Sequence, residues 1–95
     1  MILRTRQADL EIIGIYVDGA ERFGVAQAEA YHEGLTATFG VLSEHPRMAR
    51  ERTELDPPVR LHPYRAHMIV YVEQGGGILV IRILHGHQDW ERHLS

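Results

Sequence analysis

The chain has 95 residues, of which 44% are hydrophobic and 24% are charged, values that are typical of one folded domain and that exclude a disordered protein. It contains no cysteine, which excludes a disulfide scaffold, a thiol nucleophile and a cysteine-ligated zinc or iron–sulfur site. Ten arginines and no lysine oppose 13 acidic residues, and the resulting net charge of −3 argues against direct nucleic-acid binding by the chain alone.

The first helix is predicted directly after a short β-prone entry, residues 1–4. Thr5 can cap the N-terminus of this helix, because its hydroxyl can accept a hydrogen bond from a free backbone N–H of the first turn. The apolar positions that recur at helical spacing, and that we expect to be buried, are Leu10, Ile13, Val17 and Ala20. The pattern stops at Phe23-Gly24, where we expect the helix to end.

Two further apolar residues of this helix lie off that stripe. At 100° per residue, Ile12 and Ile15 point roughly 150° away from it. The helix is therefore apolar on two sides. It is either packed between two other elements of the domain, or it carries an exposed apolar strip that binds a partner.

A second helix is predicted almost immediately after the first, which makes the pair an antiparallel helical hairpin. It should end by His45, since Pro46 disfavours helical geometry in the residue before it. Gly14 and Gly34 lie on or beside the buried stripes, and we expect them to permit close packing. The apolar stripe of the second helix is Ala28, Tyr31, Leu35, Phe39 and Leu42.

After a polar connector at 46–58, the hydrophobic period changes from that of a helix to that of strands. Strands are predicted at 59–64, 66–72 and 78–84, and the glycine-rich segment Gln74–Gly77 indicates a hairpin turn between the last two. This order predicts a single α+β domain over residues 1–95. An N-terminal β-strand and an antiparallel helical hairpin pack on a C-terminal three- to four-stranded antiparallel sheet.

Histidine and arginine are the candidate residues for chemistry. His85, His87 and His93 are close in sequence, but a glycine and the lack of a nearby acid at ligand spacing argue against zinc, and no metal or cofactor is predicted. Arg82 interrupts an apolar strand, where it needs a partner or water. Together with Arg60, His62 and Tyr64 on the sheet, it could assist RNA cleavage. The simpler interpretation, which we favour, pairs Arg82 with an acid.

The sequence gives no sign of a membrane protein. Its longest apolar runs are much shorter than the ~20 residues that cross a bilayer. The segment at residues 1–4 lacks the order of features that defines a signal peptide. We expect a cytoplasmic protein.

Short motifs in a fixed order run through nearly the whole chain. They are Arg6-Gln7-Ala8-Asp9-Leu10-Glu11-Ile12-Ile13, Glu21-Arg22-Phe23-Gly24, Leu42-Ser43-Glu44-His45-Pro46 and Tyr64-Arg65-Ala66-His67-Met68-Ile69-Val70-Tyr71. The most specific is Ile81-Arg82-Ile83-Leu84-His85-Gly86-His87-Gln88-Asp89, which is followed by Arg92-His93-Leu94. With these motifs, the chain resembles the ParE branch of the RelE/ParE superfamily of bacterial toxins, and the resemblance implies the same α+β fold.

The resemblance also implies a function. ParE-like toxins belong to type II toxin–antitoxin systems. They inhibit DNA gyrase by stabilising its cleaved-DNA complex, without being enzymes, and a ParD-like antitoxin neutralises them in a hetero-oligomer, expected here to be a heterotetramer or larger. RelE-like relatives with the same fold cleave mRNA in the ribosome, but they are strongly basic and use lysines that this chain lacks. A ribosome-dependent ribonuclease and a detoxified interaction module remain the alternatives.

Two groups of site residues are predicted, one on the most specific motif of the resemblance and one on the side of the first helix that lies off its apolar stripe. The candidates for toxicity and gyrase contact are Arg82, His85, Asp89, Trp90 and Arg92. The candidates for antitoxin binding are Ile12, Ile15 and Tyr16. A structural alternative exists for the first group, in which Trp90 and Leu94 close one end of the core while Asp89 pairs with Arg82.

Overall fold

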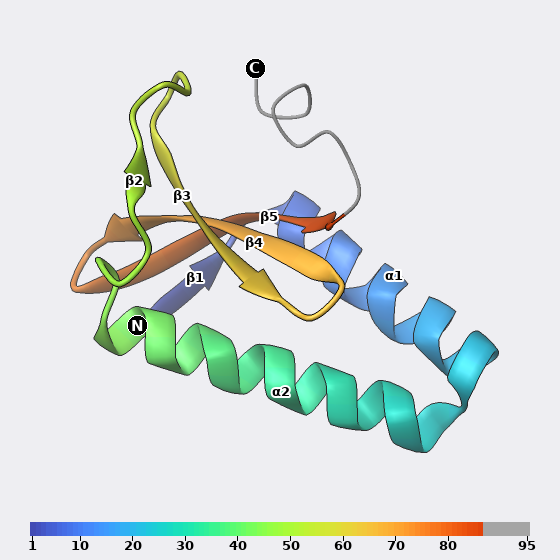
Figure 1. Cartoon of the computed structure of the whole chain (residues 1–95). Helices are drawn as coiled ribbons and strands as arrows, with labels where there is room; N and C mark the ends of the chain where they lie inside the picture. The colour runs from blue at the N-terminus through green and yellow to red at the C-terminus, as the bar shows by residue number, and fades with distance from the viewer. Residues whose placement is uncertain (87–95) are drawn as a thin grey trace.

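The computed structural model describes residues 1–86, which form two helices and five strands (Figure 1). The two helices form a hairpin that lies against one face of the sheet. This arrangement confirms the predicted α+β fold. In chain order the elements are β1 (Ile2–Arg4), α1 (Arg6–Phe23), α2 (Val25–Glu44), β2 (Glu51–Arg52), β3 (Val59–Tyr64), β4 (His67–Gln74) and β5 (Gly77–His85).

Both helices begin and end where the sequence predicts. The Thr5 hydroxyl caps α1 by accepting a hydrogen bond of 3.0 Å from the Ala8 N–H. Gly24, with a φ of 92°, separates α1 from α2, because this backbone conformation is open to glycine and strained for other residues. The second helix ends at Glu44, two residues before Pro46. Neither α1 nor α2 is long and apolar enough to cross a membrane.

The sheet is mixed, with the strand order β1-β5-β4-β3-β2. β1 pairs in parallel with β5, with Ile2 opposite Ile78, and the other neighbours are antiparallel. The sheet therefore has five strands and is mixed, where a three- to four-stranded antiparallel sheet was predicted: the predicted N-terminal strand joins it in parallel as β1, and β2 was not predicted. β2 has only two residues and no detectable hydrophobic period, and β1 is joined to a strand that lies at the other end of the described chain.

The main core lies between the helices and the sheet. Its largest fully buried side chain is Tyr71, whose hydroxyl donates a 2.9 Å hydrogen bond to the Pro46 carbonyl. The predicted α2 stripe is confirmed, apart from Tyr31, which is only half-buried. Its buried members are Ala28, Leu35, Phe39 and Leu42. A second, smaller cluster lies on the opposite face of the sheet and is formed by Leu55, Val59, Val70 and Leu84.

The rotation of α1 differs from the prediction. Leu10, Ile13 and Val17 were expected in the core, but their exposed fractions are 52%, 59% and 48%. Ile12 and Ile15 instead pack against the main core. The prediction that these two isoleucines point away from the core is wrong, and the reason for assigning them to antitoxin binding no longer holds.

The two helical glycines have different environments. At Gly34 a Cβ atom would overlap the Tyr64 hydroxyl, which donates a 3.2 Å hydrogen bond to the Tyr31 carbonyl. Close packing at Gly34 is confirmed, although its neighbour is a side chain of β3 and not the other helix. At Gly14 a Cβ would meet nothing within 4 Å, so the packing role expected for Gly14 is wrong.

This difference predicts opposite effects of alanine at the two glycines. Gly14→Ala should raise the free energy of unfolding by about 0.5–1 kcal/mol, because alanine favours the helix and the space is open. Gly34→Ala gains the same helix propensity but displaces the Tyr64 ring, and overpacking costs about 1–3 kcal/mol. We therefore expect it to be the less stable of the two variants in urea unfolding. Equal stability would contradict the close contact with Tyr64.

Candidate functional site

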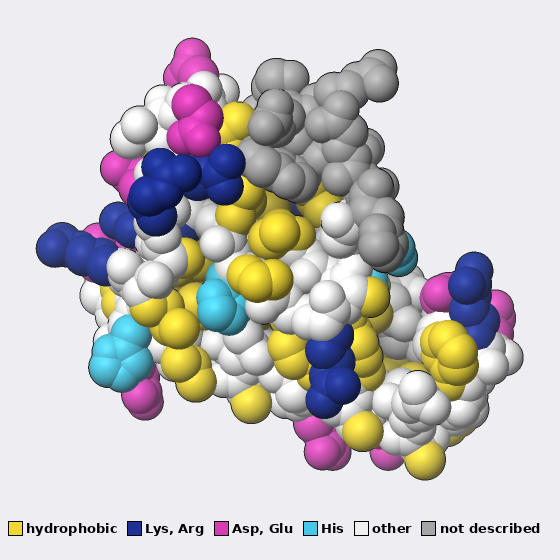
Figure 2. All heavy atoms as spheres, viewed as in Figure 1, with side chains coloured by type: hydrophobic (Ala, Val, Ile, Leu, Met, Phe, Trp, Pro, Cys, Tyr) yellow, Lys and Arg dark blue, Asp and Glu magenta, His cyan; other side chains and the backbone are white. Residues whose placement is uncertain are grey.

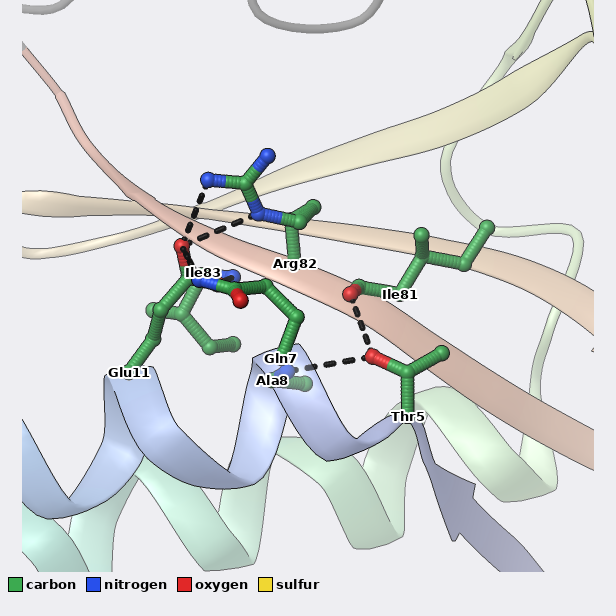
Figure 3. Close-up of polar contacts among 7 residues, drawn as sticks. All are labelled: Thr5, Gln7, Ala8, Glu11, Ile81, Arg82 and Ile83. Atoms are coloured by element: carbon green, nitrogen blue, oxygen red, sulfur yellow. Dashed lines mark hydrogen bonds and ion pairs between the residues drawn. The ribbon is translucent and has the colours of Figure 1, made fainter.

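Arg82, the first of the predicted toxicity residues, is engaged by a carboxylate of α1. Its Nε and Nη2 atoms donate hydrogen bonds of 2.9 Å and 2.7 Å to Glu11 Oε2 (Figure 3). The two side chains are 26% and 16% exposed, so the ion pair is shielded from solvent more than a surface pair is. The interpretation that Arg82 pairs with an acid is confirmed. Within the described residues that acid is Glu11, while Asp89 lies beyond them.

The same contact closes one edge of the sheet. β1 ends at Arg4, and β5 continues beyond it with an irregular register opposite Val70 and Tyr71. Along this stretch the Thr5 hydroxyl donates a 2.6 Å hydrogen bond to the Ile81 carbonyl, and Glu11 Oε1 accepts one of 2.8 Å from the Ile83 N–H (Figure 3). Two side chains from the start of α1 thus replace a neighbouring strand.

The hydrogen bonds of Thr5 and Glu11 also explain the rotation of α1. They join the first two turns of the helix to β5, which fixes the side of the helix that faces the sheet. Ile12 and Ile15 follow Glu11 on that side, and Ile13 and Val17 face away from it. The sequence signal for this rotation was a threonine and a glutamate followed by isoleucines. It could not be interpreted alone, because the partners of Thr5 and Glu11 lie on a strand more than 70 residues further along the chain.

Behind the ion pair, the helices and the ends of β4 and β5 surround a cavity of about 540 Å³. Tyr31 from α2 and His67 from β4 line it, joined by a 2.6 Å hydrogen bond between the Tyr31 hydroxyl and His67 Nδ1. The exposed His85 of β5 also lines it and contacts His67 edge to face, with 5.4 Å between the ring centroids. The other lining residues include Glu11, Ile15, Asp18, Arg22, Phe23 and Ile83.

The surroundings of His67 favour its neutral form. Burial lowers the pKa of His67 below its ordinary value of 6.5, and His85 lowers it further, with partial compensation by Asp18. A neutral imidazole can accept a hydrogen bond from the Tyr31 hydroxyl at Nδ1, whereas an imidazolium can only donate one. Among residues 1–86, no group of three or more histidines or carboxylates is placed to hold a metal ion.

The lowered pKa of His67 predicts a loss of stability in acid. Between pH 6.5 and the lower pKa of the folded chain, the unfolded chain binds a proton at this histidine more fully than the folded chain does. The free energy of unfolding should therefore fall as the pH falls from 6.5 through the folded pKa, and the contribution should be complete above 6.5. His67→Asn keeps an acceptor for Tyr31 but does not titrate. Denaturant unfolding of both proteins from pH 8 to pH 5 should show a steeper decline for the unsubstituted chain, and parallel curves would contradict the assignment.

An apolar strip covers the solvent side of α1. Leu10, Ile13 and Val17, which we call the α1 strip, follow the i, i+3, i+7 spacing of one helical face. The predicted antitoxin residue Tyr16 lies off this strip. It is half-buried against α2, where its hydroxyl donates a 3.4 Å hydrogen bond to Glu29 and its ring meets His32 edge to face. None of the three predicted antitoxin residues therefore belongs to the α1 strip.

Arginines of the connector gather with acids over the β2–β3 end of the molecule (Figure 2). Arg47 pairs with Glu73 at 3.2 Å, and Arg52 pairs with Glu54 at 2.8 Å. Both signs of charge are mixed there. This end of the described chain therefore lacks the one-signed basic surface that nucleic-acid binding requires.

The remaining predicted residues divide into three sets. On β3, Arg60 donates a 2.7 Å hydrogen bond through Nη1 to the Ala49 carbonyl, and Tyr64 packs on α2, so both have structural partners. Arg82 and His85 lie on the last strand, next to the α1 end of the sheet. The others, at positions outside the described residues, are His87, Asp89, Trp90, Arg92, His93 and Leu94.

Comparison with known proteins places these features in context. A family model described as the ParE toxin of the type II toxin–antitoxin system parDE matches residues 2–90. Toxin ParE1 of Caulobacter vibrioides is 33% identical over 92 residues, which cover 97% of this chain and 93% of the relative. Toxin ParE3 of the same organism is 28% identical over 94 residues, covering 99% and 94%.

A solved structure supports the fold separately. The structure described as the chromosomal ParDE TA system from P. aeruginosa contains a chain that matches with a TM-score of 0.74 and 20% sequence identity. The match covers 88% of this chain and 92% of that one. At this identity the likeness concerns the fold.

Proposed function

Because the chain belongs to the ParE toxin family of type II toxin–antitoxin systems, we propose that it inhibits DNA gyrase by binding and stabilising the cleaved-DNA complex. A ParD-like antitoxin, bound to it in the cytoplasm, neutralises it. The observation that carries a binding function is the α1 strip, because three large apolar side chains at helical spacing face solvent on one helix.

The α1 strip fits the apolar face of a helical antitoxin segment. Helical partners dock through side chains at i, i+3, i+4 and i+7, and Leu10, Ile13 and Val17 present the matching surface. An antitoxin segment that orders on binding can cover such a strip without a preformed groove. The strip replaces Ile12, Ile15 and Tyr16 as the proposed antitoxin surface.

Action by binding, and not by catalysis, is supported by the polar contacts of the sheet. Within residues 1–86, the guanidinium of Arg82 is held by Glu11 and that of Arg60 by the Ala49 carbonyl. RNA cleavage would need a positioned general acid and general base beside such cations, and neither Glu11, which is occupied by Arg82 and Ile83, nor the Ala49 carbonyl can serve as one. The net charge of −3 also opposes a stable contact with ribosomal RNA.

One observation favours the ribosome-dependent ribonuclease as the second candidate. Tyr31, His67 and His85 line one cavity, and His67, kept neutral by its lowered pKa, has the protonation state of a general base at pH 7. A nuclease acting here would lose activity in His67→Asn and His85→Ala.

Induced expression in a sensitive bacterium, paired with a supercoiling assay on purified gyrase, tests the proposal. Gyrase poisoning predicts filamentation, a DNA-damage response and accumulation of cleaved DNA, all reversed by co-expression of a ParD-like antitoxin. An immediate halt of translation, with mRNA cuts that disappear in His85→Ala, would instead establish the ribonuclease. Normal growth with intact antitoxin binding would identify a detoxified interaction module.

A further inference from the structure

Glu11 carries a charge that the closure of the sheet edge does not require. The Ile83 N–H needs one oxygen acceptor, which Glu11 Oε1 supplies at 2.8 Å. At the adjacent position on the same edge, the neutral hydroxyl of Thr5 satisfies the Ile81 carbonyl. The side-chain carbonyl oxygen of a glutamine at position 11 could accept a hydrogen bond from the same N–H. The contact with Ile83 therefore does not explain why residue 11 carries a negative charge.

The negative charge of Glu11 orients Arg82. Nε and Nη2 of Arg82 converge on the single oxygen Oε2 of Glu11, at 2.9 Å and 2.7 Å. Figure 3 shows the guanidinium held beside β5 with its third nitrogen, Nη1, directed away from Glu11. No hydrogen bond joins Nη1 to any of residues 1–86. Its two N–H donors thus lie at a fixed place on the molecule.

A fixed donor pair binds a partner at lower entropic cost than a freely rotating arginine does. An exposed arginine loses several rotatable bonds of freedom when it docks, whereas this one is already ordered by its ion pair. The planar guanidinium also suits the carboxylate, phosphate or carbonyl oxygens that a protein–DNA complex displays.

We infer that Glu11 is a positioning residue for toxicity: it holds Arg82 so that Nη1 donates to an oxygen acceptor on the gyrase–DNA complex. The inference rests on the proposed function, because it names the group through which the toxin would engage that target. Glu11 itself does not contact the target. It acts through Arg82.

The test compares Glu11→Gln, Arg82→Ala and the double variant for stabilisation of cleaved DNA by purified gyrase. Glu11→Gln preserves the acceptor for Ile83 but removes the charge that orders Arg82. We expect it to need about tenfold more toxin for the same cleavage, the difference between a charge-assisted and a neutral hydrogen bond. Asp9→Asn is the matched control, since it removes an exposed ion pair with Arg4 from the same helix.

Three further readouts separate positioning from stability. Glu11→Gln should keep the antitoxin affinity and the far-UV circular dichroism of the unsubstituted chain, and the NMR signal of Arg82 Nε–Hε should move and exchange faster with solvent. The double variant should be no weaker on gyrase than Arg82→Ala alone, because Glu11 acts only through Arg82.

Each alternative outcome has a distinct meaning. If the unsubstituted chain stabilises cleaved DNA and Glu11→Gln does so equally well, the inference is overturned while the proposed function stands. Additive losses in the double variant would also overturn the inference. If the unsubstituted chain has no effect on gyrase, the proposed function fails, and the inference fails with it.

Discussion

Ile13→Asp combined with Val17→Asp is expected to abolish antitoxin binding without changing the melting temperature of the toxin. Both side chains face solvent in the free protein, so a carboxylate at either position stays hydrated and leaves the core intact. In the complex the two carboxylates would be buried against an apolar partner. Loss of two central apolar contacts at an interface costs about 2–4 kcal/mol each, which corresponds to at least a thousandfold weaker binding.

Calorimetric titration with a ParD-like antitoxin and thermal melts of the free toxin measure the two effects. A matched control is Val41→Asp, which changes an apolar residue of α2 that is 48% exposed and lies off the α1 strip. It should leave the affinity within a few-fold of the original. If the strip variant binds as tightly as the unsubstituted toxin, the antitoxin docks elsewhere.

Ile12→Asp combined with Ile15→Asp is expected to unfold the domain. These isoleucines pack against the main core, so each aspartate would place a carboxylate against apolar side chains. The cost of several kcal/mol per site is comparable to the 5–15 kcal/mol that stabilises a typical domain. Antitoxin binding and toxicity should then disappear together.

Circular dichroism and hydrogen exchange of the purified variant would show whether the fold survives. The comparison with Ile13→Asp/Val17→Asp is informative because both changes put two aspartates on one helix, three or four residues apart. A well-folded Ile12/Ile15 variant that fails to bind antitoxin would show that the original assignment of these residues was correct and that the α1 strip is incidental.

The sequence alone was sufficient for the helical hairpin and for most of the strands. Helix boundaries depend on local groups such as the Thr5 cap and the Gly24 break, which a short window of sequence contains. The parallel pairing of β1 with β5 and the two-residue β2 have no such local signal. Both are set by contacts between distant segments.

The rotation of α1 could not be predicted, because the helix is apolar on two sides. The side that packs on the sheet is chosen by Thr5 and Glu11, whose partners Ile81 and Ile83 lie in the last strand. The same limit applies to Arg82: its need for an acidic partner followed from its place in an apolar strand, but the identity of that partner did not. The site depends on tertiary contacts, which hydrophobic periodicity does not encode.

The pairing of β1 with β5 affects when the protein can fold during synthesis. The first strand needs the last one as its neighbour, and the Thr5–Ile81 contact joins residues 76 positions apart. The helical hairpin can form early, but a contact of this sequence separation closes late. The main core, which includes Ile78, Val80 and Ile83, is completed only once β5 has left the ribosome. A nascent toxin therefore lacks its finished surface until β5 has left the ribosome, and an antitoxin already present in the cell can bind it from that moment.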